Sequence, residues 1–195
     1  NYIGDTVLID NILHSGNTTM LAISCQTGSN SFINRNIIAN LTNNNPNGTA
    51  VSLNGIRAWN QTANLEIKDN YIWALKDSSA NTSSTTGAAM IGINISSATN
   101  NILVEGNRIN DLKNLSRTAA SSSMVIGILN TSGLPIIRSN IVEQLLNRSS
   151  STGTNTVATL IGIYSSSFTP NQIISDNIVR NLTYDNPIPV SAQII

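Results

Sequence analysis

Charge, aromatic rings and cysteine are all scarce in this chain of 195 residues. Only 10% of the residues are charged, 4% are aromatic, and the formal net charge at pH 7 is zero. Without an excess of positive charge there is no electrostatic footprint for nucleic acid or anionic lipid, so we expect no nucleic-acid partner. No stretch approaches the ~18 consecutive apolar residues of a transmembrane helix, so we expect no membrane insertion.

The single cysteine, Cys25, excludes an internal disulfide and a metal site built from several cysteines. The alternation of residues around it places Cys25 on an inward row, as a small buried apolar side chain. The only histidine, His14, stands near no cysteine or acidic pattern that would complete a metal site or a catalytic triad. We therefore expect no metal ion and no cofactor.

Amide and hydroxyl groups take the place of charge, and they are organised in a repeat. The chain has 30 asparagines, against 10 acidic and 10 basic residues. Such a polar composition is typical of disorder, but aliphatic residues recur here in a fixed frame, which disfavours disorder. The frame is clearest over residues 65–75, where it reads aliphatic, x, aliphatic, x, x, Asn, x, aliphatic, x, x, Leu.

Five asparagines mark full copies of this frame, and Asn11 marks a degenerate copy. The full copies are centred on Asn36, Asn70, Asn107, Asn140 and Asn177. Starting from Asn11, the intervals between them are 25, 34, 37, 33 and 37 residues. A period of this length, sustained along the whole chain, indicates stacked repeat units rather than an ordinary globular domain.

A second anchor follows the asparagines by about twenty residues in the full units. It reads Gly55-Ile56, Gly92-Ile93, Gly127-Ile128 and Gly162-Ile163, with Ala22-Ile23 as the early counterpart. Residues around the anchor alternate with the period of two that is typical of a strand, and the asparagine frame supplies one strand before and one after the asparagine. The distance from asparagine to anchor varies, so we expect inserted loops at residues 42–50, 76–89, 113–123 and 147–156.

Three short strands per unit, stacked on their equivalents in the next unit, predict an all-β fold. We expect a right-handed, single-stranded parallel β-helix of about five to six coils with one inserted loop per coil. Residues 1–195 would form one segment, which we expect to be a fragment of a longer chain. A leucine-rich repeat is the alternative, but its units run ~20–29 residues and return through a leucine-rich segment.

The recurring asparagine then has a structural role. At the bend between two strands it tolerates the left-handed backbone conformation, and its side chain would point inward and bond to the asparagine of the next coil. Asn36, Asn70, Asn107, Asn140 and Asn177 would thus form a ladder that specifies the register of the coils. Asp10, Asp69 and Asp176, which precede frame asparagines, are interpreted as turn residues.

This frame resembles the right-handed parallel β-helix repeats of the pectate-lyase-like superfamily. Its Asn-Leu-Thr turns and Gly-Ile strands are similar to those of large secreted or surface proteins of bacteria, particularly Bacteroidetes. The resemblance covers the whole chain and implies a location outside the cell or on its surface. It says little about activity, because the superfamily includes lyases, hydrolases, adhesins and passive stalks.

A lyase or polygalacturonase would be expected to carry aspartates on neighbouring coils beside a basic residue or a calcium ion. The two polar rows after the glycine anchor contain no carboxylate, so we assign no catalytic residue and lean against an enzyme. The candidate ligand-binding residues on these rows are Arg57, Trp59, Asn94 and Tyr164, because an aromatic face and a guanidinium suit a sugar. A further row, placed outward by the alternation, is entirely apolar, and we expect the loops to cover it: Met20, Leu53, Met90, Val125 and Leu160.

The leading hypothesis is a structural, adhesive or ligand-presenting segment of a secreted or cell-surface protein, with a polysaccharide or cell-surface ligand as partner. The alternative is a polysaccharide-binding or polysaccharide-degrading β-helix, a lyase or hydrolase whose catalytic residues lie outside this segment. A trimeric fibre shaft is a third hypothesis. Unpaired strand edges at the two ends of the stack predict end-to-end or edge self-association.

Overall fold

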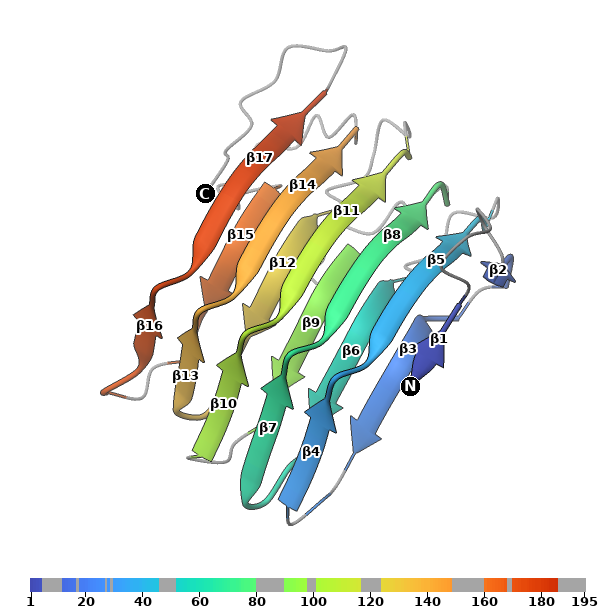
Figure 1. The fold of residues 1–195 in the computed structure, drawn as a ribbon. Coiled ribbons are helices and arrows are strands. Elements are labelled where there is room, and N and C mark those ends of the chain that lie inside the picture. The colour runs from blue at the N-terminus through green and yellow to red at the C-terminus, as the bar shows by residue number, and fades with distance from the viewer. Residues whose placement is uncertain are drawn as a thin grey trace.

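The computed structural model describes residues 1–4, 12–16, 18–26, 28, 30–45, 52–79, 90–97, 101–116, 124–148, 160–167 and 170–185. Their strands stack in three parallel sheets, and successive turns of the chain follow one another along the stack (Figure 1). None of the described segments is a helix long and apolar enough to cross a membrane.

Each sheet collects one strand from every turn. Sheet 1 contains β4 (Asn30–Asn34), β7 (Asn64–Lys68), β10 (Asn101–Glu105), β13 (Pro135–Arg138) and β16 (Ile173–Ser175). Sheet 2 contains β1 (Tyr2–Ile3), β2 (Ile12–His14), β5 (Ile37–Asn43), β8 (Tyr71–Asp77), β11 (Arg108–Asn114), β14 (Ile141–Asn147) and β17 (Ile178–Tyr184). Sheet 3 contains β3 (Met20–Gln26), β6 (Leu53–Trp59), β9 (Met90–Ser96), β12 (Val125–Asn130) and β15 (Leu160–Ser165).

The chain is a parallel β-solenoid, as the repeat predicted, with one strand of each sheet per turn. The number of turns is about four, which corrects the expected five to six. The complete turns are β4-β5-β6, β7-β8-β9, β10-β11-β12 and β13-β14-β15. The expectation was too high because it counted a unit at each end, where the described residues supply only part of a turn.

The first rung of the stack is Asn1 rather than Asn11. Its Nδ2 donates to Oδ1 of Asn36 at 3.0 Å, and the following residues of β1 pair in register with Ile37 and Ile38. Asn11 lies outside the described residues, and β2, directly after it, pairs with the far half of β5. The interval from Asn1 to Asn36 is 35 residues, which matches the other repeats, whereas the interval of 25 residues from Asn11 did not.

The frame asparagines form the expected ladder inside the bend between sheets 1 and 2. From Asn36 through Asn70, Asn107 and Asn140 to Asn177, each Nδ2 donates to the Oδ1 of the next turn at 2.8, 2.9, 3.0 and 2.9 Å. The same oxygens also accept the backbone N–H of the preceding rung. From Asn70 onward, a second hydrogen bond runs from each Nδ2 to a backbone carbonyl of the preceding turn, for example from Asn107 to Ile67 at 2.8 Å. Every amide group in the row is therefore satisfied.

The left-handed residue at this bend is the one before the asparagine, which corrects our expectation. Positive φ occurs at Arg35, Asp69, Gly106, Ser139 and Asp176, with values of 54–57° for the four non-glycine residues and 67° for the glycine. Asp69 and Asp176 are thus turn residues, as interpreted, and Asp10 lies outside the described residues. The sharp corner is made one residue early, so that the asparagine side chain points along the stack toward its equivalent.

Sheet 2 has a second left-handed position, four residues after each ladder asparagine. It is occupied by Asn40, Ala74, Asp111, Gln144 and Asn181, with φ of 54–57°. These residues are skipped in the strand register, since their neighbours on both sides pair and they do not. Each strand of sheet 2 therefore carries a local break that changes which later residues face inward.

The glycine anchor breaks the alternation of sheet 3 in the same way, and this overturns the expected orientation of one row. Leu53 and Ile56, three residues apart, both belong to the core, so the strand loses its phase at Gly55 between them. The apolar row that we expected outside lies inside for this reason: Leu53, Met90, Val125 and Leu160 are buried in the core, and Met20 packs against it. Ile91, the residue after Met90, lies in a separate cluster with Met124, Ile126, Leu129 and Ile161.

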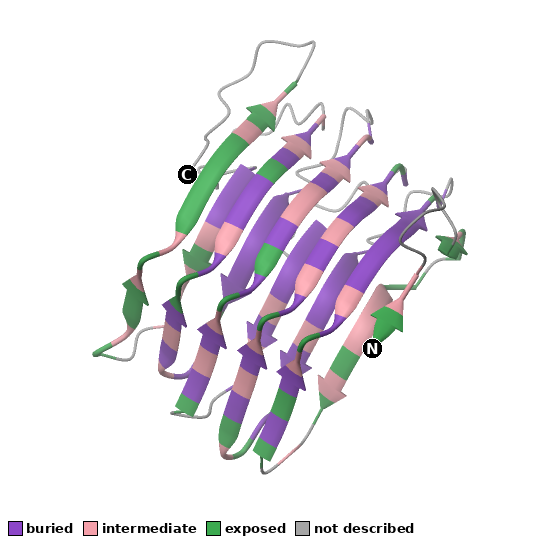
Figure 2. Ribbon diagram, viewed as in Figure 1, coloured by how far each residue is buried: buried purple, intermediate pink, exposed green. Residues whose placement is uncertain are grey.

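A side chain at the glycine would not fit. A Cβ added to Gly92 would lie 2.6 Å from the carbonyl oxygen of Gly127 and 2.8 Å from Cγ2 of Ile109 in sheet 2. The interior is otherwise filled by aliphatic rows, and Figure 2 shows these buried residues as purple bands that recur from strand to strand. Cys25 is a free thiol packed against this core.

The expected inserted loops begin later than predicted. Residues 42 and 43, 76 and 77, 113 and 114, and 147 still belong to strands of sheet 2. Most of the remaining loop positions lie outside the described residues.

We predict that Asn107→Ala destabilises the solenoid severely. The substitution removes the acceptor of both the backbone N–H and the side-chain amide of Asn70, and the donor to Asn140. A buried polar group left without a partner costs roughly 1–3 kcal/mol, and several are left here. Urea denaturation should show a fall of several kcal/mol in the free energy of unfolding.

The control is Asn101→Ala, in the same turn but on the exposed outer face of sheet 1. Surface substitutions of this kind change stability by roughly 0.5 kcal/mol or less. Equal losses for the two variants would contradict a special role of the interior ladder.

Candidate functional site

Three side-chain rows cross the outer face of sheet 1, at right angles to its strands. The first row is an exposed asparagine ladder in which Asn64 Nδ2 donates to Asn30 Oδ1 at 2.7 Å and Asn101 Nδ2 donates to Asn64 Oδ1 at 2.9 Å. The central row, in register, is Phe32, Glu66, Leu103, Ile136 and Ile173. The third row is Asn34, Lys68, Glu105, Arg138 and Ser175.

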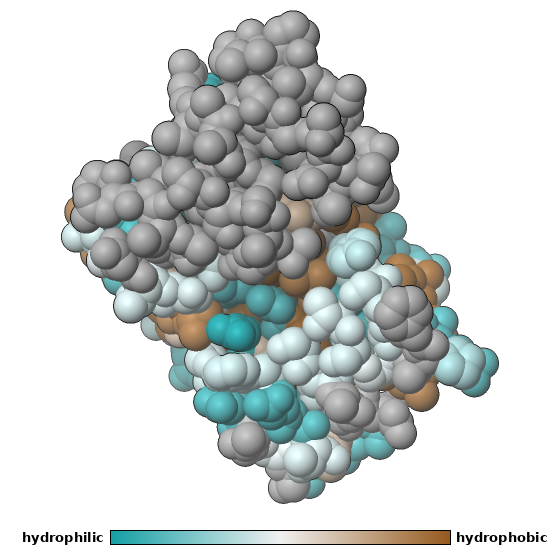
Figure 3. All heavy atoms as spheres, turned by 180° about the vertical axis from the view of Figure 1, so that it is seen from behind, coloured by the Kyte–Doolittle hydropathy of each residue, from teal (hydrophilic) through white to brown (hydrophobic). Residues whose placement is uncertain are grey.

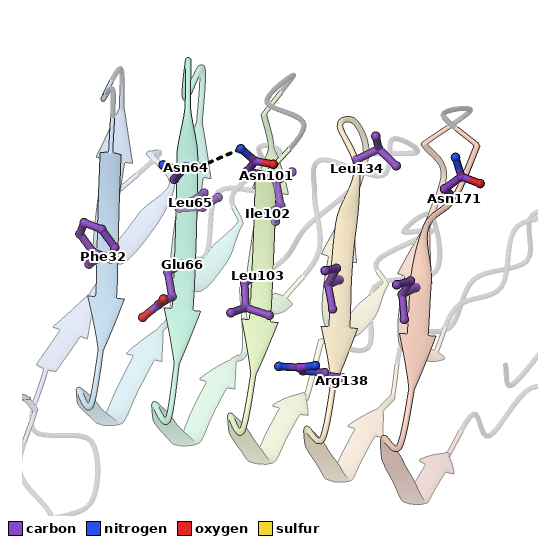
Figure 4. A pocket seen from close by; sticks show the side chains of 12 residues that line it. Phe32, Asn64, Leu65, Glu66, Asn101, Ile102, Leu103, Leu134, Arg138 and Asn171 are labelled. Carbon is purple, nitrogen blue, oxygen red and sulfur yellow. Dashed lines mark hydrogen bonds between the residues drawn. The ribbon is translucent and has the colours of Figure 1, made fainter.

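These rows enclose a groove of about 530 Å³ that runs across the strands of sheet 1. Figure 4 shows Phe32 at one end, Glu66 and Leu103 on neighbouring strands, and Asn171 beyond Leu134 at the other. Apolar side chains make its floor, since Leu103 and Ile136 are half-buried while Phe32 and Ile173 are exposed. Asn64 and Asn101 of the amide row line one side of the groove, and Arg138 of the charged row lines the other.

The charged row is internally neutralised. Glu105 Oε1 accepts from Arg138 Nε at 2.7 Å, and its Oε2 lies 3.3 Å from Lys68 Nζ. These two hydrogen bonds, from Arg138 first and Lys68 second, hold the pKa of Glu105 below its usual range. Glu66 accepts a hydrogen bond from Asn34 Nδ2 at 2.6 Å. The groove therefore offers oriented acceptors and donors with little net charge.

Sequence reasoning missed this groove, although a signal for it exists. Its central row lies four positions before each ladder asparagine, next to inward residues such as Ile33 and Ile67. Alternation makes that position outward, and its occupants are mostly apolar. An outward row of aliphatic and aromatic residues in a chain with few aromatics would have marked the face as a candidate.

The four residues that the sequence analysis selected lie on sheet 3, and only three of them come together. Arg57 and Asn94 are register neighbours on β6 and β9, and the Cζ of Arg57 lies 4.3 Å from the ring centre of Trp59. Asn94 Nδ2 donates to Asn54 Oδ1 at 2.9 Å. Leu129 separates Asn94 from Tyr164 in the register, so Tyr164 stands apart from the other three.

Two donors in this group are buried without a partner. Neither Nε of Arg57 nor Nε1 of Trp59 makes a hydrogen bond within the described part of the structure.

The molecule is seen from behind in Figure 3, where the described surface mixes hydrophilic atoms with brown hydrophobic patches.

The outer face of sheet 2 carries a different cluster, built on Glu143. Its two carboxylate oxygens lie 2.8 Å from Arg108 Nη2 and 2.6 Å from Arg180 Nη2. Hydrogen bonds from Arg108 and then Arg180 hold the pKa of Glu143 below its usual range. Arg108 also lies over the ring of Tyr71, which stacks on Trp73. All three charged groups are thus paired with one another, and the cluster ties together neighbouring turns.

Asp77 is the titratable group with the most unusual surroundings, and it faces the interior. It occupies a second buried row, formed in register by Asn43, Asp77, Asn114 and Asn147. Asn43 Nδ2 donates to Asp77 Oδ1 at 3.2 Å and the Ser79 N–H donates to the same oxygen at 3.0 Å. Burial raises the pKa of Asp77 to about 6, against these hydrogen bonds, which lower it. It is a carboxyl in a row of amides rather than a group in a cleft.

Metal chemistry has no visible site in the part of the chain that the structure describes, because no three His, Cys, Asp or Glu side chains gather there. The fold and these faces define a parallel β-solenoid with an outer groove. No family model, no curated protein and no solved structure matches the chain.

We predict that Asp77→Asn stabilises the protein at pH 8 and leaves it nearly unchanged at pH 4. Because the pKa rises on folding from 3.8 to about 6, the folded state binds this proton more tightly than the unfolded state. The stability that the parent protein gains from this tighter proton binding is fully present below pH ~4 and is lost as the pH rises through ~6. It amounts to roughly 3 kcal/mol of the free energy of unfolding. Urea denaturation of both proteins across this pH range measures it.

The control for removing one negative charge is Asp185→Asn, at an exposed ion pair with Arg148. It should leave the pH profile of stability close to that of the parent. A parent and an Asp77→Asn variant with parallel pH profiles would contradict the prediction.

Proposed function

We propose that this chain is a ligand-presenting, adhesive segment of a secreted or cell-surface protein, and that it binds an extended carbohydrate along the groove of sheet 1. The observation that carries the proposal is the groove itself. It combines a mostly apolar floor with asparagine amides on one side and the ion-paired Arg138 on the other, and it extends over all the strands of its sheet.

The shape of the groove favours an extended ligand. It runs from Phe32 on β4 to Ile173 on β16, across five parallel strands. With neighbouring strands about 4.8 Å apart, this distance is roughly 19 Å. A polymer lying along the solenoid axis would meet the central row at every turn, and this row is apolar except at Glu66.

The chemistry of the groove favours a sugar over other polymers. Each exposed asparagine amide offers both donors and an acceptor, as sugar hydroxyls require, and Phe32 with the aliphatic floor suits the apolar faces of sugar rings. Nucleic acid requires an excess of Lys and Arg along its phosphates, whereas Lys68 and Arg138 are both ion-paired to Glu105 here. A peptide that adds a strand requires an open sheet edge, and this groove lies on a face.

Binding is favoured over cleavage by the state of the acids. Hydrolysis of a glycosidic bond needs two carboxyl groups, one of them kept protonated by a raised pKa. Glu66 lines the groove and Glu105 lies in the charged row of the neighbouring strand, which keeps a lyase or hydrolase as the second hypothesis. The lowered pKa of Glu105 makes it a poor general acid, so any cleavage would depend on catalytic residues elsewhere.

The extracellular or cell-surface location, the right-handed coil and the pectate-lyase-like relationship rest on the sequence resemblance alone. They stay predictions.

We predict that Phe32→Ala and Leu103→Asn each weaken binding of a polysaccharide by about tenfold or more. Both side chains point outward and form the floor of the groove, so their loss removes ligand contacts without opening the core. A contact worth about 1.4 kcal/mol changes the dissociation constant tenfold. Affinity electrophoresis against a panel of neutral and acidic polysaccharides identifies the ligand, and calorimetry then measures the variants.

Tyr164→Ala is the matched control, because Tyr164 is an exposed aromatic residue on sheet 3. It should leave the affinity unchanged. If Tyr164→Ala weakens binding while the two groove variants do not, the proposed site is wrong. If the parent protein releases reducing or unsaturated ends from a polysaccharide and Glu66→Gln does not, the enzyme hypothesis is favoured instead.

Association through strand edges is also proposed. Among the described strands, β16 and β17 pair on one side only, and Ile174 and Val179 are exposed beside a cavity of about 330 Å³. Light scattering over a range of concentrations should show a mass that grows with concentration. A constant monomeric mass at high concentration would contradict the proposal.

A further inference from the structure

Sheet 3 carries a single charged residue, Arg57, in its five strands. Its register neighbours on the adjoining strands are Ser24 and Asn94, which are neutral. Four other arginines among the described residues are neutralised: Arg108 and Arg180 by Glu143, Arg138 by Glu105, and Arg148 by Asp185. Arg57 has no acidic partner within the described residues.

The guanidinium of Arg57 is nevertheless held in place. Its Cζ lies 4.3 Å from the centre of the Trp59 ring, so the cation stacks on the indole. Both side chains are half-buried, which restricts them further. Stacking positions the charge but satisfies none of its hydrogen-bond donors.

Two N–H groups are left without acceptors by this arrangement. Nε of Arg57 and Nε1 of Trp59 are both buried and unpaired within the described part of the chain. Buried donors are paired in the great majority of cases, and an exception points to a group that is missing from the structure. The missing group must accept hydrogen bonds, because both atoms are donors only.

We propose that Arg57 and Trp59 form a second ligand site, which takes an oxyanion such as a carboxylate, sulfate or phosphate group of a ligand. A negative charge would neutralise the single cation of sheet 3, and guanidinium groups bind oxyanions through charge-assisted hydrogen bonds. The indole N–H supplies a further donor from the same strand, β6. One isolated cation cannot follow the many phosphates of a nucleic acid, so the site suits a single acidic group. Because it lies on sheet 3, it is independent of the groove on sheet 1.

The fluorescence of Trp59 reports on this site directly. The chain has two tryptophans, and Trp73→Phe leaves Trp59 as the only one. Trp73 lies on sheet 2, where phenylalanine preserves an aromatic ring beside Tyr71. In this background, sodium acetate, sulfate and phosphate are titrated against sodium chloride at equal ionic strength.

The expected result is a saturable change in Trp59 emission with at least one oxyanion and none with chloride. Arg57→Gln should raise the half-saturating concentration tenfold or more, while Arg35→Gln, which removes an exposed arginine at a turn, should leave it unchanged. Circular dichroism and thermal melting of each variant confirm folding. Should Arg57→Gln fail to fold, Arg57→Lys keeps the charge without the planar fork and should weaken the response several-fold.

A response to acetate alone would define a carboxylate site, and a response to sulfate or phosphate would define a site for a tetrahedral oxyanion. The proposal is overturned if no oxyanion gives a saturable change up to about 100 mM, where screening is already strong. It is equally overturned if folded Arg57→Gln responds as the parent does.

Discussion

A buried amide that finds its partners only in the neighbouring turn is the constraint on which this structure depends. Asn107 is fully buried, and its side chain bonds to Asn70 on one side and Asn140 on the other. No other register of the turns would satisfy these groups, and the cost of leaving them unpaired is high inside a protein. Burial of the hydrophobic rows stabilises the stack, but these rows are nearly uniform aliphatic surfaces. They would allow neighbouring turns to slide past one another. The amides select one alignment.

The outer surface inherits this alignment. With the turns held in register, residues at one frame position line up across all strands of a sheet, and the three rows of the groove on sheet 1 are a direct result. A side chain that is unremarkable alone, such as Leu103, becomes part of a continuous floor. The scarcity of charge makes the remaining ionic groups conspicuous: Glu105 and Glu143 each hold two cations from other turns, whereas Arg57 is the one charged residue of the sheet 3 strands and has no acidic partner among the described residues.

The places where the sequence misled are those where the backbone departs from regular alternation. Gly55 and its equivalents shift the phase of sheet 3, so that Leu53 and Ile56 both face inward. The second left-handed position is occupied by residues as different as Ala74 and Gln144, so no residue type marks it in the sequence. The sequence frame around the first rung, Asn1, is incomplete. Only its spacing of 35 residues from Asn36 could have marked it.

By itself, the sequence determined the repeat, the parallel stacking of three strands per turn and the interior asparagine ladder, because these follow from periodic positions that any folded state must satisfy. Only the tertiary structure decided which faces carry sites. Phe32, Leu103 and Arg138 come from strands more than thirty residues apart, and only the register of the turns makes them one groove. The ion pairs of Glu105, Glu143 and Asp185 were likewise decided there, because they form between turns and depend on side chains meeting across strands. The ladder asparagines thus fix the frame, and the outward positions that they align hold the chemistry.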